Sequence, residues 1–167
     1  RICSAYPSII EDAIVQLRRD LETYIDMYPQ FAGTLVPLKE KPGAPPIAKD
    51  MHRAGEAANV GPMAAVAGAM AETIGQYLRR YSSEVIVENG GDIFMALNGT
   101  ATIGLFAGQS PLSMRIGLQL EPGQEPMGVC TSSGTIGHSL SHGRADAARA
   151  HDAQSPAGDV AASSAES

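Results

Sequence analysis

The sequence predicts an α+β fold in which helices pack on one face of an antiparallel β-sheet. Apolar residues recur at helical spacing over the first half of the chain, and after residue 81 their period changes from about 3.6 to about 2 residues. The links between the later β-rich runs are short and contain Gly, Asn and Pro, which favours antiparallel hairpins over parallel crossovers. With 167 residues, the chain is long enough for one domain with a substantial core.

The first helix is predicted over residues 7–28, where apolar side chains recur every three or four positions with charged side chains between them. Pro29 ends it, because proline lacks a backbone donor and clashes with the preceding turn. The stretch PLKEKPGAPP, residues 37–46, holds four prolines and is predicted to be a linker or a surface excursion.

Two more helices are predicted over residues 48–59 and 63–81, with a break at Gly61-Pro62. The segment GPMAAVAGAMAE, residues 61–72, is mostly Ala and Gly, and such a surface allows close approach of another backbone or of a flat ligand. We favour a helix that packs on the sheet. A functional role requires the break to open onto the same cleft as Gly90-Gly91.

Five β-rich runs follow the helices, and their short links predict a meander of successive hairpins. The runs are SEVIVEN, DIFMAL, ATIGLFA, SMRIGLQL and MGVCTSS, at residues 83–89, 92–97, 101–107, 113–120 and 127–133. We expect residues 1–146 to form one domain. Residues 147–167 are Ala, Ser, Asp and Gly with almost no large apolar side chain, which predicts a flexible tail.

The composition excludes several classes of partner. The chain has 12 basic and 18 acidic residues and a formal charge of −6, which argues against a broad nucleic-acid or membrane-surface footprint. Cys3 and Cys130 are too few for a disulfide framework or a metal cluster, which favours a reducing compartment. No apolar window is long enough to cross a bilayer, and no leader sequence is visible, so we expect a soluble cytoplasmic protein.

The turn in VENGGDI carries more polar chemistry than a hairpin needs. Gly90 and Gly91 allow positive φ and leave backbone N–H groups bare, so a ligand oxygen can approach the chain directly. Glu88 and Asp92 flank them and could hold a ribose hydroxyl, an amino group or a divalent cation. The alternative is a plain hairpin whose acids face water, and spacing alone favours it.

A second candidate is the hydroxyl- and glycine-rich segment CTSSGTIGHSLSHG, residues 130–143. Hydroxyl- and glycine-rich loops suit phosphate binding, through O–H and exposed N–H groups. No lysine follows the glycines, so it is not a P-loop, and Gly-x-Ser-x-Gly is absent, so it is not a nucleophile elbow. A polar strand exit is the alternative, but so dense a run favours function. Cys130 is predicted to be a buried small residue.

His138 and His142 lie four residues apart, a spacing that binds metal on a helical face. Gly137 and Gly143 indicate a loop instead, and no third ligand is near, so we do not predict a zinc site. One of the two histidines is expected to contact a phosphate or to carry a proton.

Taken together, these motifs resemble the ApbE-like flavin transferases, and more closely a small uncharacterised family related to them. The resemblance covers roughly residues 15–147. The stretches that carry it are LETYIDMYPQFAGTLVPL, VGPMAAVAGAMAE, VIVENGGDI and GVCTSSGTIGHSLSHGRADA.

The resemblance implies a T-fold-like (ApbE-like) domain that often forms oligomers, so we expect a homodimer. It also implies a site for FAD, a nucleotide-type small molecule. In the ApbE enzymes a magnesium-dependent reaction moves the FMN half of FAD onto a hydroxyl of a target protein. A divalent ion that bridges the pyrophosphate makes AMP a better leaving group.

The resemblance also implies roles for residues of this chain. His138 would contact phosphate and act with Asp92 in catalysis. The metal-side carboxylate would be Glu72 or Asp92, and Asp146 lies at the position of a late metal motif. The residues expected to bind the cofactor are Glu88, Asn89, Gly90, Gly91, Asp92, Thr131, Ser132, Ser133, Gly134 and Thr135.

The chain departs from the enzymes' pattern in ways that favour binding without transfer. Ala67 stands where the enzymes carry a lysine, Glu72 where they carry an aspartate, and Ala150 where the late motif has a threonine. The early strands expected before the first helix are missing. Two alternatives remain open. One is a non-catalytic module that holds a purine- or pterin-like ring with the Glu88 carboxylate, and the other is an interaction subunit without a small ligand.

Overall fold

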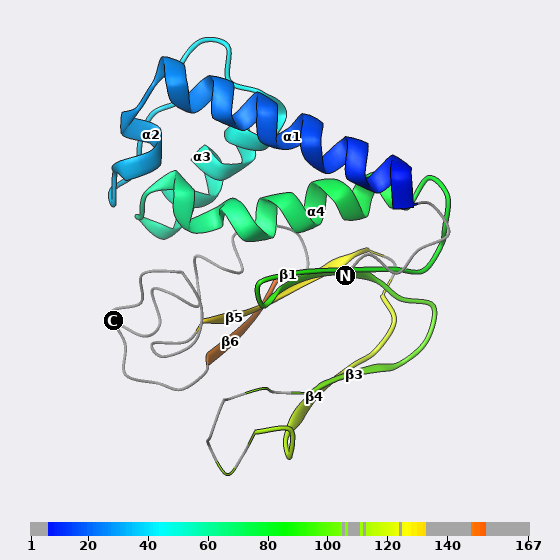
Figure 1. The fold of residues 1–167 in the computed structure, drawn as a ribbon. Helices are drawn as coiled ribbons and strands as arrows, with labels where there is room; N and C mark the ends of the chain where they lie inside the picture. Colours follow the sequence, from blue (N-terminus) through cyan, green and yellow to red (C-terminus); the bar gives the residue numbers. More distant parts are fainter. Residues whose placement is uncertain are drawn as a thin grey trace.

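The computed structural model describes residues 7–104, 106, 111, 113–123, 125–132 and 148–152. Helices lie on one side of a four-stranded sheet, and a two-stranded hairpin lies on the other side (Figure 1). The α+β class, the antiparallel pairing and the helices on one face are confirmed. None of the described helices is long and apolar enough to cross a membrane.

The three predicted helices are present with small changes at their ends, and the short helix α2 was not predicted. Helix α1 spans Pro7–Met27 and α2 spans Gln30–Gly33. Helix α3 spans Pro46–Ala58 and begins two residues earlier than predicted, because proline is well suited to the first helical turn. A 3₁₀ turn, η1, spans Pro62–Ala65 and leads into α4, Val66–Leu78, which ends three residues earlier than predicted.

The strand connectivity differs from the predicted meander. The four-stranded sheet has the order β1-β2-β5-β6, so β2 pairs with β5 rather than with β3, and β3 and β4 form a separate antiparallel pair. The strands are β1 Val85–Asn89, β2 Asp92–Ala96, β3 Ala101–Gly104, β4 Gly117–Leu120, β5 Met127–Ser132 and β6 Ala148–Asp152.

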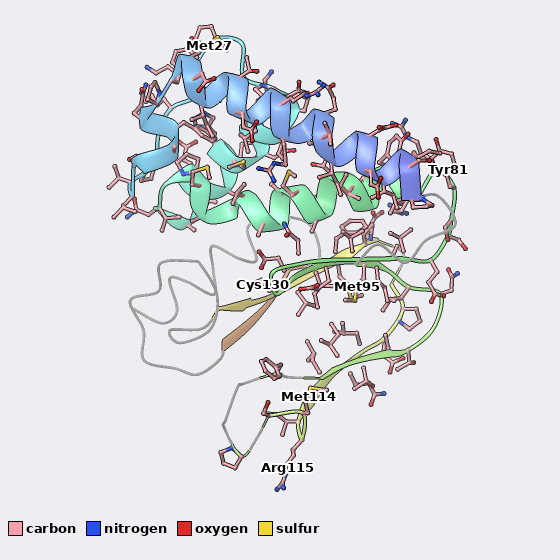
Figure 2. The ribbon with its side chains drawn as sticks, viewed as in Figure 1. Met27, Tyr81, Met95, Met114, Arg115 and Cys130 are labelled. Atoms are coloured by element: carbon pink, nitrogen blue, oxygen red, sulfur yellow. The ribbon has the colours of Figure 1, made fainter. Side chains whose placement is uncertain are left out.

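Burial on both faces of the sheet explains why β3 and β4 leave it. On one face, Phe94 of β2 and Val85 of β1 pack against Ala71 of α4. On the other face, Met95 and its apolar neighbours pack against residues from β3 and β4 (Figure 2). A continuous meander would leave this second face open to water, and folding the β3–β4 hairpin underneath covers it.

Strand β6 lies inside the segment for which the sequence predicts a flexible tail. Residues 148–152 pair antiparallel with β5, from Ser132↔Ala148 to Gly128↔Asp152. Backbone hydrogen bonds to the edge of β5 require no large apolar side chain, so composition did not reveal this pairing. Residue 147 and residues 153–167 lie outside the described part of the chain.

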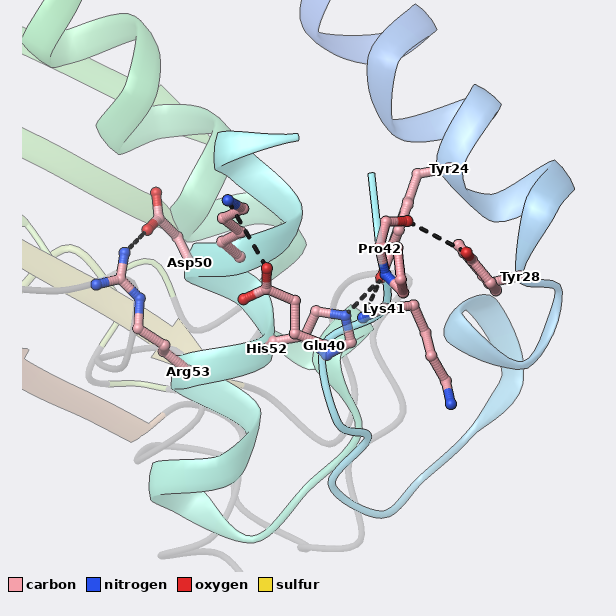
Figure 3. A network of polar contacts seen from close by, with 9 residues as sticks. Tyr24, Tyr28, Glu40, Lys41, Pro42, Asp50, His52 and Arg53 are labelled. Atoms are coloured by element: carbon pink, nitrogen blue, oxygen red, sulfur yellow. Dashed lines mark hydrogen bonds and ion pairs between the residues drawn. The ribbon is translucent and has the colours of Figure 1, made fainter. Parts of the chain in front are cut away.

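The proline-rich segment between α2 and α3 is held by a chain of buried and partly buried hydrogen bonds (Figure 3). His52 Nδ1 lies 2.6 Å from the Leu38 carbonyl oxygen, which can only accept, so Nδ1 carries the hydrogen. In the tautomer with its hydrogen on Nδ1, the ring accepts at Nε2 from the Tyr24 hydroxyl, 3.1 Å away. The Tyr24 oxygen accepts in turn from the Lys41 backbone N–H at 3.1 Å. The linker predicted from its prolines is therefore fixed onto α1 and α3.

Replacing Tyr24 by Phe is expected to lower the free energy of unfolding by about 1–1.5 kcal/mol, because His52 Nε2 and the Lys41 N–H lose their partner in a buried place. Tyr28→Phe is the matched control, because the Tyr28 hydroxyl donates a more exposed hydrogen bond to the Pro42 carbonyl. Urea unfolding of both variants checks this. Equal losses in the two variants would contradict a special role for the buried chain.

Candidate functional site

The glycine turn predicted as a site forms the tight end of the β1–β2 hairpin. Asn89 pairs with Asp92 across the turn, and the two residues between them have φ values of 65° at Gly90 and 104° at Gly91. Both values lie in the left-handed region, which glycine adopts without the steric penalty of a side chain. The two glycines are therefore explained by the turn itself.

Asn89 fastens this turn to the beginning of α4. Its Nδ2 donates to the carbonyl oxygen of Ala67, in the first turn of the helix, at 3.1 Å. Asp92, its cross-strand partner, lies on the same face of the sheet and is only 5% exposed. Phe94, two residues further along β2, packs on α4 as well. The side of the turn that bears Asn89 and Asp92 therefore faces the helix.

Glu88 lies on the opposite side of the hairpin. Side chains alternate along a strand, so Glu88 points away from the face that carries Asn89. Its Oε1 accepts a hydrogen bond from the backbone N–H of Gly91 at 2.9 Å, and the residue is exposed. The predicted set of turn side chains is thus divided, with Asn89 and Asp92 toward α4 and Glu88 away from it.

The end of β5 lies at the same end of the sheet as the glycine turn. Val129 pairs with Ile93, so in the same register Cys130 lies level with Asp92, and the chain from Thr131 onward extends past the start of β2. Thr131 and Ser132 are the last two residues of β5. The other predicted residues of this segment and beyond it lie outside the described residues: Ser133, Gly134, Thr135, His138, His142 and Asp146.

The predicted metal ligands are placed only in part. Glu72 lies on α4, half-buried, one residue after the buried Ala71. Within the part of the chain that the structure describes, no group of three or more His, Cys, Asp or Glu side chains could hold a metal ion. Glu72 and Asp92 are therefore the two described carboxylates on which a metal-binding hypothesis depends.

Cys130 is buried, as the sequence predicts for a small residue in an apolar run. Figure 2 places it in β5, beneath α4. The 3% exposure of this side chain leaves little access for a reagent or substrate, which is unlike the setting of a reactive thiol.

The opposite end of α4 carries an exposed aromatic group. The hydroxyls of Tyr77 and Tyr81 lie 3.5 Å apart, and the Arg80 guanidinium lies over the Tyr77 ring at 5.5 Å from its centre. The hydrogen bond to Tyr81 raises the pKa of Tyr77, while the charge of Arg80 acts in the opposite direction. This group is remote from the glycine turn along the helix, so we do not include it in the site.

The backbone acceptor at Ala67 is the part of the site that sequence reasoning missed. Every residue has a carbonyl oxygen, and nothing in the amino-acid sequence marks that of Ala67 as the partner of Asn89. The Ala and Gly residues at the start of α4 are a usable signal, because a helix surface without long side chains lets the hairpin approach closely.

These features define an α+β protein in which a glycine hairpin is fastened to the first turn of a small-residue helix. The family model described as AbpE bacteria matches residues 4–165, and the chain belongs to this family.

Similar proteins are named UPF0280 protein. The UPF0280 protein of Methanococcus aeolicus is 44% identical over 145 residues, which cover 85% of this chain and 58% of that protein. The UPF0280 protein of Methanococcus vannielii is 43% identical over 159 residues, which cover 93% of this chain and 64% of that protein. The UPF0280 protein of Methanocaldococcus jannaschii is 43% identical over 154 residues, covering 91% and 62%. The chain thus spans about six tenths of these relatives.

These matches correct the family assignment made from the motifs. The matching model is described as AbpE bacteria, and the relatives are named UPF0280 protein. Neither finding ties the chain to the ApbE FAD:protein FMN transferases, so the placement among their distant relatives was wrong. Four stretches of the sequence carried that placement, and two of them are glycine- or hydroxyl-rich segments of a kind that recurs in unrelated phosphate sites.

Proposed function

We propose that the end of the sheet at the glycine turn binds a nucleotide-type ligand, with FAD as the first candidate. The observation that carries the proposal is the hydrogen bond from Asn89 to the Ala67 carbonyl, because it fixes the turn against the first turn of α4. The N-terminal end of a helix favours a phosphate, and the small residues Ala67 and Gly68 near the start of α4 stay partly exposed.

Charge balance indicates what such a ligand needs. The sequence has no Lys or Arg between Arg80 and Arg115, so no basic side chain of the hairpin can neutralise a pyrophosphate. Mg²⁺ is commonly held by one or two carboxylates together with ligand phosphates and water. Asp92 and Glu72 fit this requirement in chemistry, since one faces α4 and the other lies on it. Bound there, the ion would supply charge neutralisation.

The alternative with a purine- or pterin-like ring depends on the Glu88 carboxylate. That carboxylate accepts from Gly91 and lies on the side of the hairpin away from α4, so no observation favours it as a ring-binding group. Transfer of the FMN half of FAD to a hydroxyl of a target protein requires that FAD binds first. It becomes testable once FAD binding has been measured.

The test is a fluorescence titration of FAD with and without Mg²⁺, on the wild type and on Asp92→Asn. We expect the dissociation constant to rise about tenfold when Mg²⁺ is chelated, and again about tenfold in the variant, because each change removes one charged contact worth ~1.4 kcal/mol. Glu84→Gln is the control, because Glu84 is exposed and precedes β1.

Two outcomes would contradict the proposal. The first is the absence of FAD binding by the wild type under either condition, which would leave an interaction subunit as the better hypothesis. The second is equal binding by folded Asp92→Asn and Glu84→Gln, with circular dichroism confirming that both variants fold. The T-fold-like arrangement, the homodimer and the cytoplasmic location stay predictions.

A further inference from the structure

The exposed carboxylate of Glu88 occupies the backbone N–H that the glycine turn offers. Gly91 N lies 2.9 Å from Glu88 Oε1, within hydrogen-bonding range for a charged acceptor. Both ends of this contact belong to the same hairpin, three residues apart. The turn therefore binds an anionic oxygen, and that oxygen comes from the protein.

A ligand phosphate would compete for the same donor. Carboxylate and phosphate oxygens are both anionic acceptors, and one N–H cannot serve both with good geometry. Repulsion would add to the competition, because a phosphate near Gly91 would meet the charge of Glu88. The hairpin itself carries no Lys or Arg, since none occurs between Arg80 and Arg115, so it offers no positive charge of its own to offset two negative groups.

We propose that Glu88 is an internal competitor for the anionic group of the ligand. Its carboxylate holds the Gly91 amide in the free protein and leaves it when a ligand phosphate binds. This inference rests on the proposed function of the site and gives Glu88 a different role from the one predicted from the sequence. Removing a ligand-binding carboxylate weakens binding, whereas removing a competitor strengthens it.

The experiment compares the wild type with Glu88→Ala, Glu88→Gln and the control Glu84→Gln. FAD and inorganic pyrophosphate are titrated by calorimetry at low ionic strength in the presence of Mg²⁺. We expect Glu88→Ala to bind both probes about tenfold more tightly than the wild type, the gain typical of removing one charge-assisted contact. Glu84→Gln removes the same charge without touching the turn and is expected to change binding less than about twofold.

A second readout does not depend on affinity. In the free protein, Glu88→Ala is expected to speed hydrogen exchange of the Gly91 amide, and pyrophosphate is expected to slow it again. An amide that exchanges at the same rate in wild type and variant would show that the contact is not formed in solution, and this would overturn the proposal.

The outcomes separate this inference from the proposed function. If the wild type binds FAD and Glu88→Ala binds it equally or more weakly, the competitor role is wrong and the site stands. If only the Glu88 variants bind, the competitor role is supported, but the wild type does not bind FAD and the proposed function fails. If the wild type and both variants bind neither FAD nor pyrophosphate, both proposals fail.

Discussion

Gly61→Ala is expected to lower the free energy of unfolding by about 3 kcal/mol, the upper end for forcing a methyl group into a packed place. A Cβ at this position would overlap the carbonyl oxygen of Thr34, and it would lie 2.8 Å from the Thr34 carbonyl carbon and 3.2 Å from Leu35 Cα. All three atoms belong to backbone, so no side chain can turn aside. The segment after α2 must move as a whole.

Thermal unfolding checks this expectation, with a fall in Tm of roughly 6–12 °C for a domain of this size. Gly33→Ala is the matched control. No atom lies within 4 Å of a Cβ built at Gly33, and the change is expected to alter stability by less than about 0.5 kcal/mol. Similar losses in both variants would mean that the close approach at Gly61 does not exist.

The loop that contains Gly61, between α3 and η1, connects the contact with Thr34 to the candidate site. A Cβ at Gly55 of α3 would meet the Val60 carbonyl oxygen at 2.8 Å and Gly61 and Pro62 at 3.3 Å. The loop therefore passes between the backbone after α2 and the backbone of α3, and it leads directly into η1 and α4. Because Ala67 holds the glycine turn, a shift at Gly61 would also move the helix end that the hairpin contacts.

The helices could be predicted because their signals are local. The alternation of apolar and charged side chains in residues 7–28 gave α1 nearly to the residue, and Pro29 marked its end. The left-handed Asn59, with φ of 59°, closes α3 where the sequence places its end. Each of these signals depends on neighbours within one or two helical turns.

The pairing of β2 with β5 could not be predicted in the same way. Short links favour pairing of successive strands, yet β3 and β4 fold underneath, because Met95 and Leu97 need apolar cover on the second face. This choice depends on which face each side chain takes after the helices have docked. Strand β6 was not predicted for a related reason. It pairs with β5 through backbone groups, and amino-acid composition does not show which backbone groups will pair.

Within the candidate site, sequence predicted the turn but not the division of its side chains. Glu88, Asn89 and Asp92 look alike as polar neighbours of two glycines. The register Asn89↔Asp92 places one pair toward α4, and the alternation of the strand sends Glu88 to the other face. A one-residue change of register would exchange these roles, and only the assembled hairpin fixes them.

Gly75→Ala is expected to destabilise the protein by about 2 kcal/mol, although Ala is the better helix former by about 1 kcal/mol. The reason is steric. A Cβ at Gly75 would overlap the Phe94 ring, which is buried between α4 and the sheet. The steric overlap is expected to destabilise the folded protein by more than the higher helix propensity of Ala stabilises it. Chemical denaturation measures the net effect.

A double-mutant cycle with Phe94→Leu decides whether the ring is the cause. Leu is shorter than Phe, so the second change should relieve the overlap. The loss of unfolding free energy in the double variant should then be smaller than the sum of the two single losses by about 1 kcal/mol or more. Met95→Leu is the control, because Met95 is the next residue but faces β3 and β4. Its effect should add to that of Gly75→Ala within about 0.5 kcal/mol. Coupling to Met95 instead of Phe94 would place α4 on the wrong face of β2. The alignment of the helix with Asn89 and Asp92, on which the proposed site depends, would then fail as well.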